Sequence, residues 1–188
     1  MRRACTVSIW LMCVFLLACV AARATTLKRM SVAEMTRAAE LVVRVRCIAS
    51  VAGWDAGEIW TLATFEVEEG WKGTPPTQIA VRLLGGTVGN LTSSVDGVPH
   101  FHTGEEVVLF LEPTRRGDYS IVSWMQGTFR IGRERATGRE CATQDTTAFA
   151  TFDPVTRRFV VNGIRNQRIE DLRAEVDRAL NEKAARSE

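Results

Sequence analysis

The sequence predicts a mainly β protein: a small barrel with a short helix before it and an amphipathic helix after it. Three observations lead to this prediction. Apolar and polar residues alternate over short runs, as in half-buried strands. Glycine, proline and aspartate separate those runs at regular intervals. Helical spacing of apolar residues is confined to a stretch after residue 30 and to the C-terminus. Strands at such intervals favour a closed or partly closed barrel.

The first 24 residues have the pattern of a cleavable export signal. Arg2 and Arg3 precede an almost unbroken apolar run from Val7 to Val20. As a helix this run would be about 21 Å long, short of the roughly 30 Å hydrocarbon core of a bilayer. The small-x-small triplet Ala22-Arg23-Ala24 then suits a signal peptidase. We therefore expect residues 1–24 to be removed and the rest to be secreted or periplasmic.

A second processing route is open. Leu16-Leu17-Ala18-Cys19 resembles a bacterial lipobox, which would be cut before Cys19 and leave a lipid-anchored protein. Leu17 is a less usual residue at its position, whereas Ala22-Arg23-Ala24 is well formed. Soluble export is therefore the favoured prediction, and contact with a membrane is expected only if Cys19 is lipidated.

The charge of the predicted mature chain excludes one class of partner. The whole sequence has 24 Lys plus Arg and 22 Asp plus Glu. Removal of Arg2, Arg3 and Arg23 leaves 21 basic residues against 22 acidic ones, a net charge of −1. This balance lacks the positive field that nucleic-acid binding needs. The chain that remains after removal of residues 1–24 is long enough for one domain with a core of its own.

The first elements of this domain are a helix and two strands. Ser31-Val32-Ala33-Glu34 has the form of a capping box and opens a short helix through Ala39. Leu41–Val51 and Ile59–Glu68 alternate as strands around a turn at Trp54–Gly57. In the first strand the expected apolar face comprises Val43, Val45, Cys47, Ala49 and Val51.

The middle of the chain continues the strand pattern. Val107–Leu111 is its most apolar run and is predicted to lie at the centre of the sheet. The glycines of Gly85–Asn90 are interpreted as bends in a barrel strand, and Arg133–Asp145 as an exposed loop. The other predicted strands are Gln78–Leu84, Tyr119–Gln126 and Thr128–Ile131.

The end of the chain predicts a hairpin and a helix. The hairpin is formed by Phe149–Phe152 and Arg158–Asn162 around Asp153-Pro154. The helix spans Arg168 to about Ala184 and has one narrow apolar stripe, which is expected to pack on the barrel. This stripe consists of Ile169, Leu172, Val176 and Leu180.

Two cysteines remain after the leader, Cys47 and Cys141. In an oxidising compartment they can form a disulfide that closes a long loop. Cys47 also falls on the apolar face of its strand, which fits a buried free thiol. The sequence leaves both interpretations open.

The order of several short motifs resembles the netrin-like domain, the OB-type barrel of the tissue inhibitors of metalloproteinases, in its bacterial exported forms. The motifs of this resemblance are Ala39-Glu40-Leu41-Val42-Val43, Phe65-Glu66-Val67-Glu68 followed by Trp71-Lys72-Gly73, and Gly104-Glu105-Glu106 before Val107–Leu111. Gly85–Gly89, Pro99-x-Phe101 and Gln126-Gly127-x-Phe129 are similar to a group of uncharacterised exported bacterial proteins. The resemblance covers residues 39–131. It implies a netrin-like barrel at residues 25–165, with residues 166–188 as a helix packed on it.

The chain departs from the inhibitors at the feature on which their mechanism depends. They present a cysteine as the first mature residue, and its amine and carbonyl clamp the protease zinc. Here the mature chain would begin near Thr25, with no cysteine before Cys47. Cleavage before Cys19 does not restore the clamp, because lipoprotein maturation acylates that amine. Metalloprotease inhibition by this route is therefore not expected.

Candidate chemistry is limited to one pair of histidines. His100 and His102, with Glu105 or Glu106, have residue types that bind zinc; in the alternative interpretation they are polar loop residues. The sequence has no G-x-S-x-G elbow and no phosphate-binding loop. We therefore predict a protein that is not an enzyme and has no cofactor.

Trp54 and Trp60 flank a predicted turn and are the tryptophans expected to be exposed. Tryptophan is enriched at recognition surfaces, so this pair is the predicted binding surface. The leading hypothesis is an exported interaction module that acts by contact with an unidentified protein. The alternatives are a protease regulator that uses barrel loops and a metal protein centred on His100 and His102.

Overall fold

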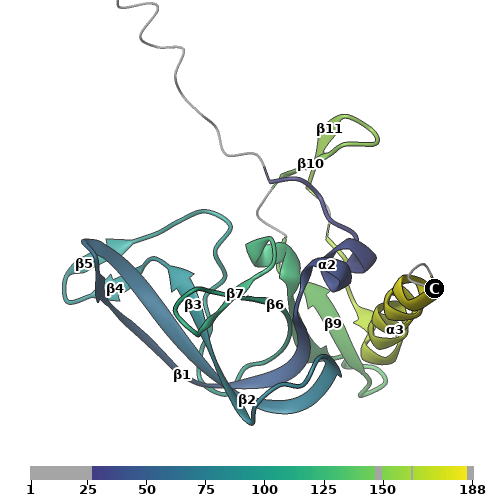
Figure 1. Cartoon of the computed structure of the whole chain (residues 1–188), viewed down its shortest axis with the longest axis horizontal. Helices are drawn as coiled ribbons and strands as arrows, with labels where there is room; N and C mark the ends of the chain where they lie inside the picture. Colours follow the sequence, from purple (N-terminus) through teal and green to yellow (C-terminus); the bar gives the residue numbers. More distant parts are fainter. Residues whose placement is uncertain (1–26, 147–149, 162, 186–188) are drawn as a thin grey trace, which may run out of the picture.

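The computed structural model describes residues 27–146, 150–161 and 163–185 (Figure 1). The predicted leader, with the predicted lipidation site Cys19, lies outside these residues. The elements in chain order are α2 (Val32–Ala38), β1 (Leu41–Asp55), β2 (Glu58–Lys72), β3 (Gln78–Leu84), β4 (Gly86–Val88), β5 (Leu91–Ser93), β6 (Glu106–Pro113), β7 (Tyr119–Ile121), the 3-10 helix η2 (Trp124–Gly127), β8 (Thr128–Arg133), β9 (Glu140–Gln144), β10 (Thr151–Asp153), β11 (Arg158–Val160), β12 (Gln167–Arg168) and α3 (Ile169–Ala185).

The predicted mainly β class is confirmed, and most strands belong to one large sheet. Its strand order is β1-β2-β3-β7-β6-β8-β9-β12, and β1 also pairs with β6. The pairings therefore run in a circuit from β1 through β2, β3, β7 and β6 back to β1. They are antiparallel except between β3 and β7, where Val81 and Tyr119 form a single parallel pair. The pairs β4–β5 and β10–β11 are separate small sheets.

The β1–β2 hairpin is longer than the sequence predicts. Its two-residue loop, Ala56-Gly57, has positive φ angles of 50° and 86°, the conformation that suits the twist of a tight hairpin. The pairing is irregular between Cys47 and Ala49, where Ile48 forms a bulge. The predicted apolar face of β1 is correct only as far as Cys47, because Val51 beyond the bulge is 66% exposed.

The core has two layers, and β6 separates them. Inward residues of β6, such as Leu109, join the cluster inside the strand circuit, while Val108 and Phe110 join the cluster under the helices. A strand covered on both faces needs apolar residues at every position, which explains the continuous apolar run. The predicted central place of Val107–Leu111 is confirmed, because all five side chains are fully buried.

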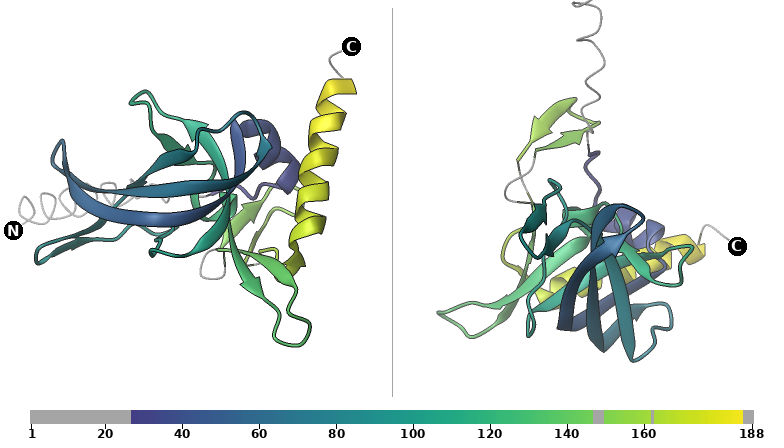
Figure 2. Two further views of the ribbon diagram at one scale, coloured as in Figure 1. Left: turned by 90° about the horizontal axis from the view of Figure 1, so that it is seen from below. Right: turned by 90° about the vertical axis from the view of Figure 1, so that its left-hand side faces the viewer.

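The two helices complete the second layer. The predicted capping box is present: the Ser31 hydroxyl accepts from the Glu34 N–H, and the Glu34 carboxylate accepts from the Ser31 N–H. Met35 of α2 packs in one cluster with Leu172 and Val176 of α3, all fully buried. Figure 2 shows α3 beside α2 along one side of the molecule. Within the described ranges, no helix has the length and apolar character to cross a bilayer.

Three predicted segments differ in the structure. Arg133–Asp145, expected to be a loop, contains β9, in which Ala142 and Gln144 are buried. The glycine-rich stretch forms the β4–β5 hairpin in addition to bends. The strand expected over Tyr119–Gln126 ends at Ile121 and gives way to η2. The late hairpin is present as β10–β11; its predicted residues Phe149 and Asn162 lie outside the described residues.

Candidate functional site

The disulfide alternative for Cys47 and Cys141 is wrong in this structure, where both are free thiols. Cys47 lies in β1 and Cys141 in β9, and β6 and β8 lie between them in the sheet. Three strand steps separate them by about 14 Å, whereas a disulfide needs Cα atoms within about 7 Å. Burial raises the pKa of the Cys47 thiol, and the nearby Glu105 charge adds to the effect. Cys47 is thus the buried free thiol of the second interpretation.

The structure does not assemble a metal site at the candidate ligands His100 and His102. The nearest contact joins His102 Nδ1 to Glu105 Oε1 at 3.4 Å, and the His102 side chain is 83% exposed. Glu105 is engaged by Arg130 at 2.9 Å, and Glu106 by Arg44 and Arg46. Within the described ranges, no three histidine, cysteine, aspartate or glutamate side chains are placed to hold a metal ion. The histidines are loop residues, as in the alternative interpretation.

Trp54 and Trp60 do not form one surface. The two-residue turn pairs Trp54 with Ile59 and Gly53 with Trp60. Because paired residues share a face, the two tryptophans point to opposite sides of the hairpin. Trp54 is 57% exposed. Trp60 is half-buried, and the guanidinium of Arg82 lies over its ring at 5.8 Å from the centroid.

Trp54 instead lines an apolar groove with residues from the β4–β5 end. The groove has a volume of about 390 Å³. Leu91 at the start of β5 is 59% exposed, and the floor includes the buried Ile59. The complete lining is Trp54, Gly57, Glu58, Ile59, Leu84, Leu91, Thr92, Ser93 and Val95. The predicted binding surface therefore did not include Leu91. Its neighbours in the sequence are polar or glycine, so no apolar pattern indicated an exposed binding residue there.

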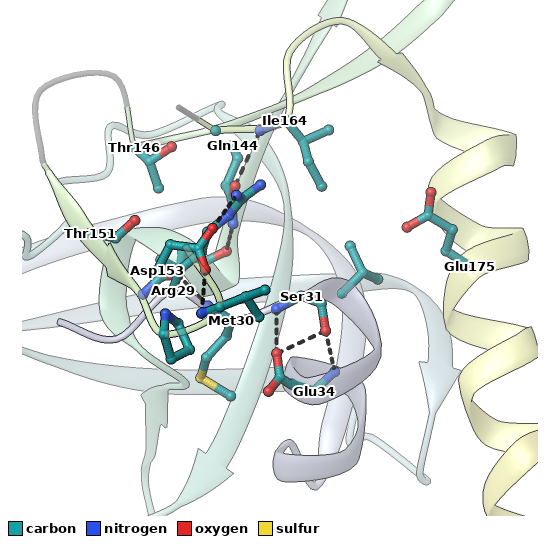
Figure 3. A pocket seen from close by; sticks show the side chains of 15 residues that line it. Arg29, Met30, Ser31, Glu34, Gln144, Thr146, Thr151, Asp153, Ile164 and Glu175 are labelled. Carbon is teal, nitrogen blue, oxygen red and sulfur yellow. Dashed lines mark hydrogen bonds and ion pairs between the residues drawn. The ribbon is translucent and has the colours of Figure 1, made fainter. Parts of the chain in front are cut away.

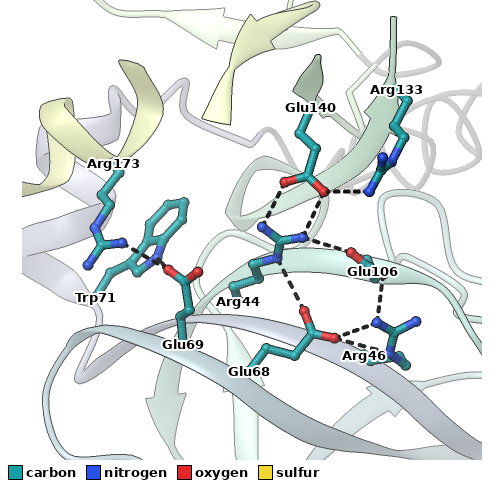
Figure 4. A network of polar contacts seen from close by, with 9 residues as sticks. All are labelled: Arg44, Arg46, Glu68, Glu69, Trp71, Glu106, Arg133, Glu140 and Arg173. Atoms are coloured by element: carbon teal, nitrogen blue, oxygen red, sulfur yellow. Dashed lines mark hydrogen bonds and ion pairs between the residues drawn. The ribbon is translucent and has the colours of Figure 1, made fainter. Parts of the chain in front are cut away.

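A second cluster joins four strands by charge (Figure 4). Arg44 of β1 contacts Glu68 of β2, Glu106 of β6 and Glu140 of β9 at 3.2, 2.9 and 2.9 Å. Arg46 shares Glu68 and Glu106 with it. The Arg44 side chain is 15% exposed and the three carboxylate side chains 24–26%. We refer to these five residues as the Arg44 network.

The Arg44 network is electrostatically satisfied. Hydrogen bonding from Arg44 lowers the pKa of Glu140, and the same bond raises the pKa of Arg44. Each charge therefore has an opposite partner, which suits a structural clasp between strands. Arg44, Arg46 and Glu68 alternate along the two arms of one hairpin, a signal that the sequence contains. Glu140, 96 residues from Arg44, has no such signal.

A cavity of about 430 Å³, lined by both polar and apolar side chains, lies where the N-terminal segment meets β10 and η2 (Figure 3). The Gln126 amide holds this segment: its oxygen accepts from Met30 N–H at 2.8 Å, and its nitrogen donates to the Lys28 carbonyl at 2.9 Å. Gln144 in turn donates to the Gln126 carbonyl and accepts from Ile164 N–H. These two glutamines fasten both sides of the cavity to the core.

The Trp71-Lys72-Gly73 motif has a structural role here. The Lys72 ammonium donates to the carbonyls of Thr36 and Ala39 at the end of α2. Gly73 has φ +76°, and a Cβ there would lie 2.6 Å from Leu41 Cδ2. The motif therefore fixes the chain between α2 and the end of β2.

No family model matches the sequence, and no curated protein matches it.

Proposed function

We propose that this chain is an exported, non-enzymatic interaction domain that binds a protein partner through the Trp54 groove. The observation that carries the proposal is the exposure of Trp54 and Leu91, 57% and 59%, around one apolar groove with a buried floor. Large aromatic side chains at the centre of a contact supply most of the binding energy in many interfaces. Binding loses little backbone conformational entropy here, because Trp54 already lies in a hydrogen-bonded strand pair next to a two-residue turn.

We further propose that the strand circuit is an OB-type barrel of netrin-like form. The order of pairings, with β3 and β7 parallel and β1 paired to both β2 and β6, supports this assignment. The positions of Trp71-Lys72-Gly73 and Gly104-Glu105 at strand ends fit the motif order on which the resemblance rests. Export is supported by the pattern of residues 1–24 alone.

The arrangement of charges favours binding over catalysis. The strongest clusters of titratable groups in the described residues are arginine–carboxylate pairs, among them the Arg44 network and the Arg82–Asp118 pair at 2.6 Å. Groups paired in this way neutralise each other's charge, whereas general acid–base catalysis uses groups that exchange a proton near neutral pH. The Cys47 thiol is buried, with a raised pKa, which disfavours a nucleophilic thiolate.

Affinity capture of the exported protein from its host tests the proposal. The wild-type bait is compared with a Trp54→Ala/Leu91→Ala bait and with a matched control, Val51→Ala, which is 66% exposed outside the groove. We expect one protein to be retained by the wild type and the control and lost from the groove variant. Equal retention by all three baits would refute the groove. A captured protease would favour the regulator alternative.

Mass spectrometry of the same bait tests export separately. A mature N-terminus at Thr25 supports signal-peptide cleavage, and a lipidated N-terminus at Cys19 supports the lipoprotein route. An intact Met1 terminus on protein recovered from the cytoplasm would refute export.

A further inference from the structure

The β10–β11 hairpin carries a second exposed apolar surface, apart from the body of the molecule (Figures 1 and 2). Phe152 and Phe159 form a cross-strand pair whose ring centroids are 5.5 Å apart. Phe159 is 62% exposed, and Val161, the residue after β11, is 53% exposed. Val155 in the connecting turn is 90% exposed. Three large apolar side chains on one short hairpin differ from the scattered ones of an ordinary soluble surface.

The same hairpin carries positive charge. Arg157 in the connecting turn and Arg158 at the start of β11 are exposed, and in the part of the chain that the structure describes neither is in an ion pair, although Arg158 lies opposite Asp153 in the strand register. The only carboxylate between residues 150 and 161 is Asp153, which pairs with Arg29 at 3.6 Å. Two arginines against one carboxylate give residues 150–161 a net charge of +1.

The hairpin is also hydrogen-bonded to the N-terminal segment of the described chain. Phe152 N–H donates to the Leu27 carbonyl at 2.9 Å, and Arg29 N–H donates to the Phe152 carbonyl at 2.8 Å. The predicted apolar export run ends at Val20, seven residues before Leu27. Seven residues span at most about 25 Å. On the lipoprotein route a lipid on Cys19, one residue further away, therefore lies within about 29 Å of the hairpin. Signal-peptide cleavage after Ala24 removes this run and leaves the hairpin to bind the bilayer on its own.

We propose that the β10–β11 hairpin is a membrane-contact element that binds the surface of an anionic bilayer. Val155, Phe159 and Val161 enter the interface, where apolar side chains leave water. Arg157 and Arg158 bind the lipid phosphates. The occupant is a lipid surface because one hairpin combines exposed apolar side chains with two exposed arginines that have no ion pair among the described residues. The hairpin also binds Leu27 and Arg29, the segment that follows the predicted lipidation site Cys19 in the chain. The β4–β5 hairpin, which contributes residues to the Trp54 groove, lies away from the β10–β11 hairpin (Figure 1).

Vesicle flotation of the exported protein tests this inference independently of the Trp54 groove. The probes are vesicles of phosphatidylcholine alone and vesicles in which phosphatidylglycerol replaces one third of the phosphatidylcholine. We expect binding to the anionic vesicles that falls with salt. Each basic side chain near such a surface contributes about fivefold. Arg157→Glu/Arg158→Glu should thus weaken binding more than tenfold, as should Val155→Asp/Phe159→Asp. Val51→Asp, an equally exposed control outside both the hairpin and the Trp54 groove, should bind as the wild type does.

A fluorescence probe reports insertion even if a lipid on Cys19 holds every variant on the vesicles. Emission of the Phe159→Trp protein, after subtraction of the wild-type signal, should shift to the blue on anionic vesicles and be quenched by brominated lipid. The emission of the Val51→Trp control should not change on the same vesicles. Unchanged emission of the Phe159→Trp protein overturns the proposal. So does a lipid-free dimer in light scattering that Phe159→Asp dissociates, since a second copy would then cover the hairpin.

Discussion

Replacement of Arg44 by methionine should destabilise the fold mainly through charge. The substitution keeps most of the side-chain volume but leaves the carboxylates of Glu68, Glu106 and Glu140 without their shared partner. Removing one member of a fully buried pair costs about 3–5 kcal/mol, and an exposed pair contributes under about 1 kcal/mol. For side chains that are 15–26% exposed, with Arg46 still present, we expect a loss of about 2–3 kcal/mol at pH 7.

The pH dependence distinguishes charge from packing. Hydrogen bonding from Arg44 holds the pKa of Glu140 below its ordinary value. The ionised carboxylate therefore favours folding above about pH 4, and this contribution disappears as the pH falls through the lower folded pKa. The difference between wild type and Arg44→Met should consequently be largest near pH 7 and shrink toward pH 3.

Urea unfolding followed by tryptophan fluorescence at pH 7, 5 and 3 measures this difference. Arg46→Met is the matched control: it lies on the same strand and shares two carboxylates, but its side chain is 43% exposed. Its effect should be clearly smaller than that of Arg44→Met at pH 7. An Arg44→Met loss that is the same at pH 3 as at pH 7 would refute the electrostatic reasoning and indicate lost packing.

Three other predictions follow from buried groups. Phe110→Ala should cost about 3–5 kcal/mol in urea unfolding because the side chain is fully buried between sheet and helices; a loss below about 1 kcal/mol would contradict the two-layer core. Gln126→Leu should cost about 1–3 kcal/mol and remove hydrogen-exchange protection at Met30 N–H, and retained protection would show that the amide does not hold the segment. Alkylation of the native protein at pH 8, read by mass spectrometry, should modify Cys141 well before Cys47, whose thiol has a raised pKa; the reverse order would contradict the burial of Cys47.

Local sequence patterns correctly predicted the helices and strands that are buried in the same way from one end to the other. The capping box at Ser31 placed α2, and the unbroken apolar run placed β6 between two layers. The helical stripe of Leu172 and Val176 placed α3 on the core. In each case neighbouring residues in the sequence share one physical requirement, so periodicity alone is sufficient.

The sequence-based predictions were wrong or incomplete where contacts between residues far apart in the sequence determine the structure. Gln144 is polar yet buried, because it bonds the backbone on both sides of the cavity, so β9 has no apolar signature. Glu140 contacts Arg44 across 96 residues, which no local pattern indicates. The opposite directions of Trp54 and Trp60 could have been predicted, since a two-residue loop at Ala56-Gly57 fixes the pairing.

The pairing of the two chain ends has a consequence for the time course of folding. Met35, near the start of the fold, shares its cluster with Val176 of the last helix, which leaves a ribosome or export channel only when most of the chain has already emerged. Leu41 of β1 likewise has no pairing partner until Leu111 of β6 has emerged, and β6 follows β2, β3, β4 and β5 in the chain. The β1–β2 hairpin therefore emerges with apolar side chains that lack their partners. Contacts between residues so far apart in the sequence form slowly, and the nascent chain is prone to aggregation until α3 has emerged.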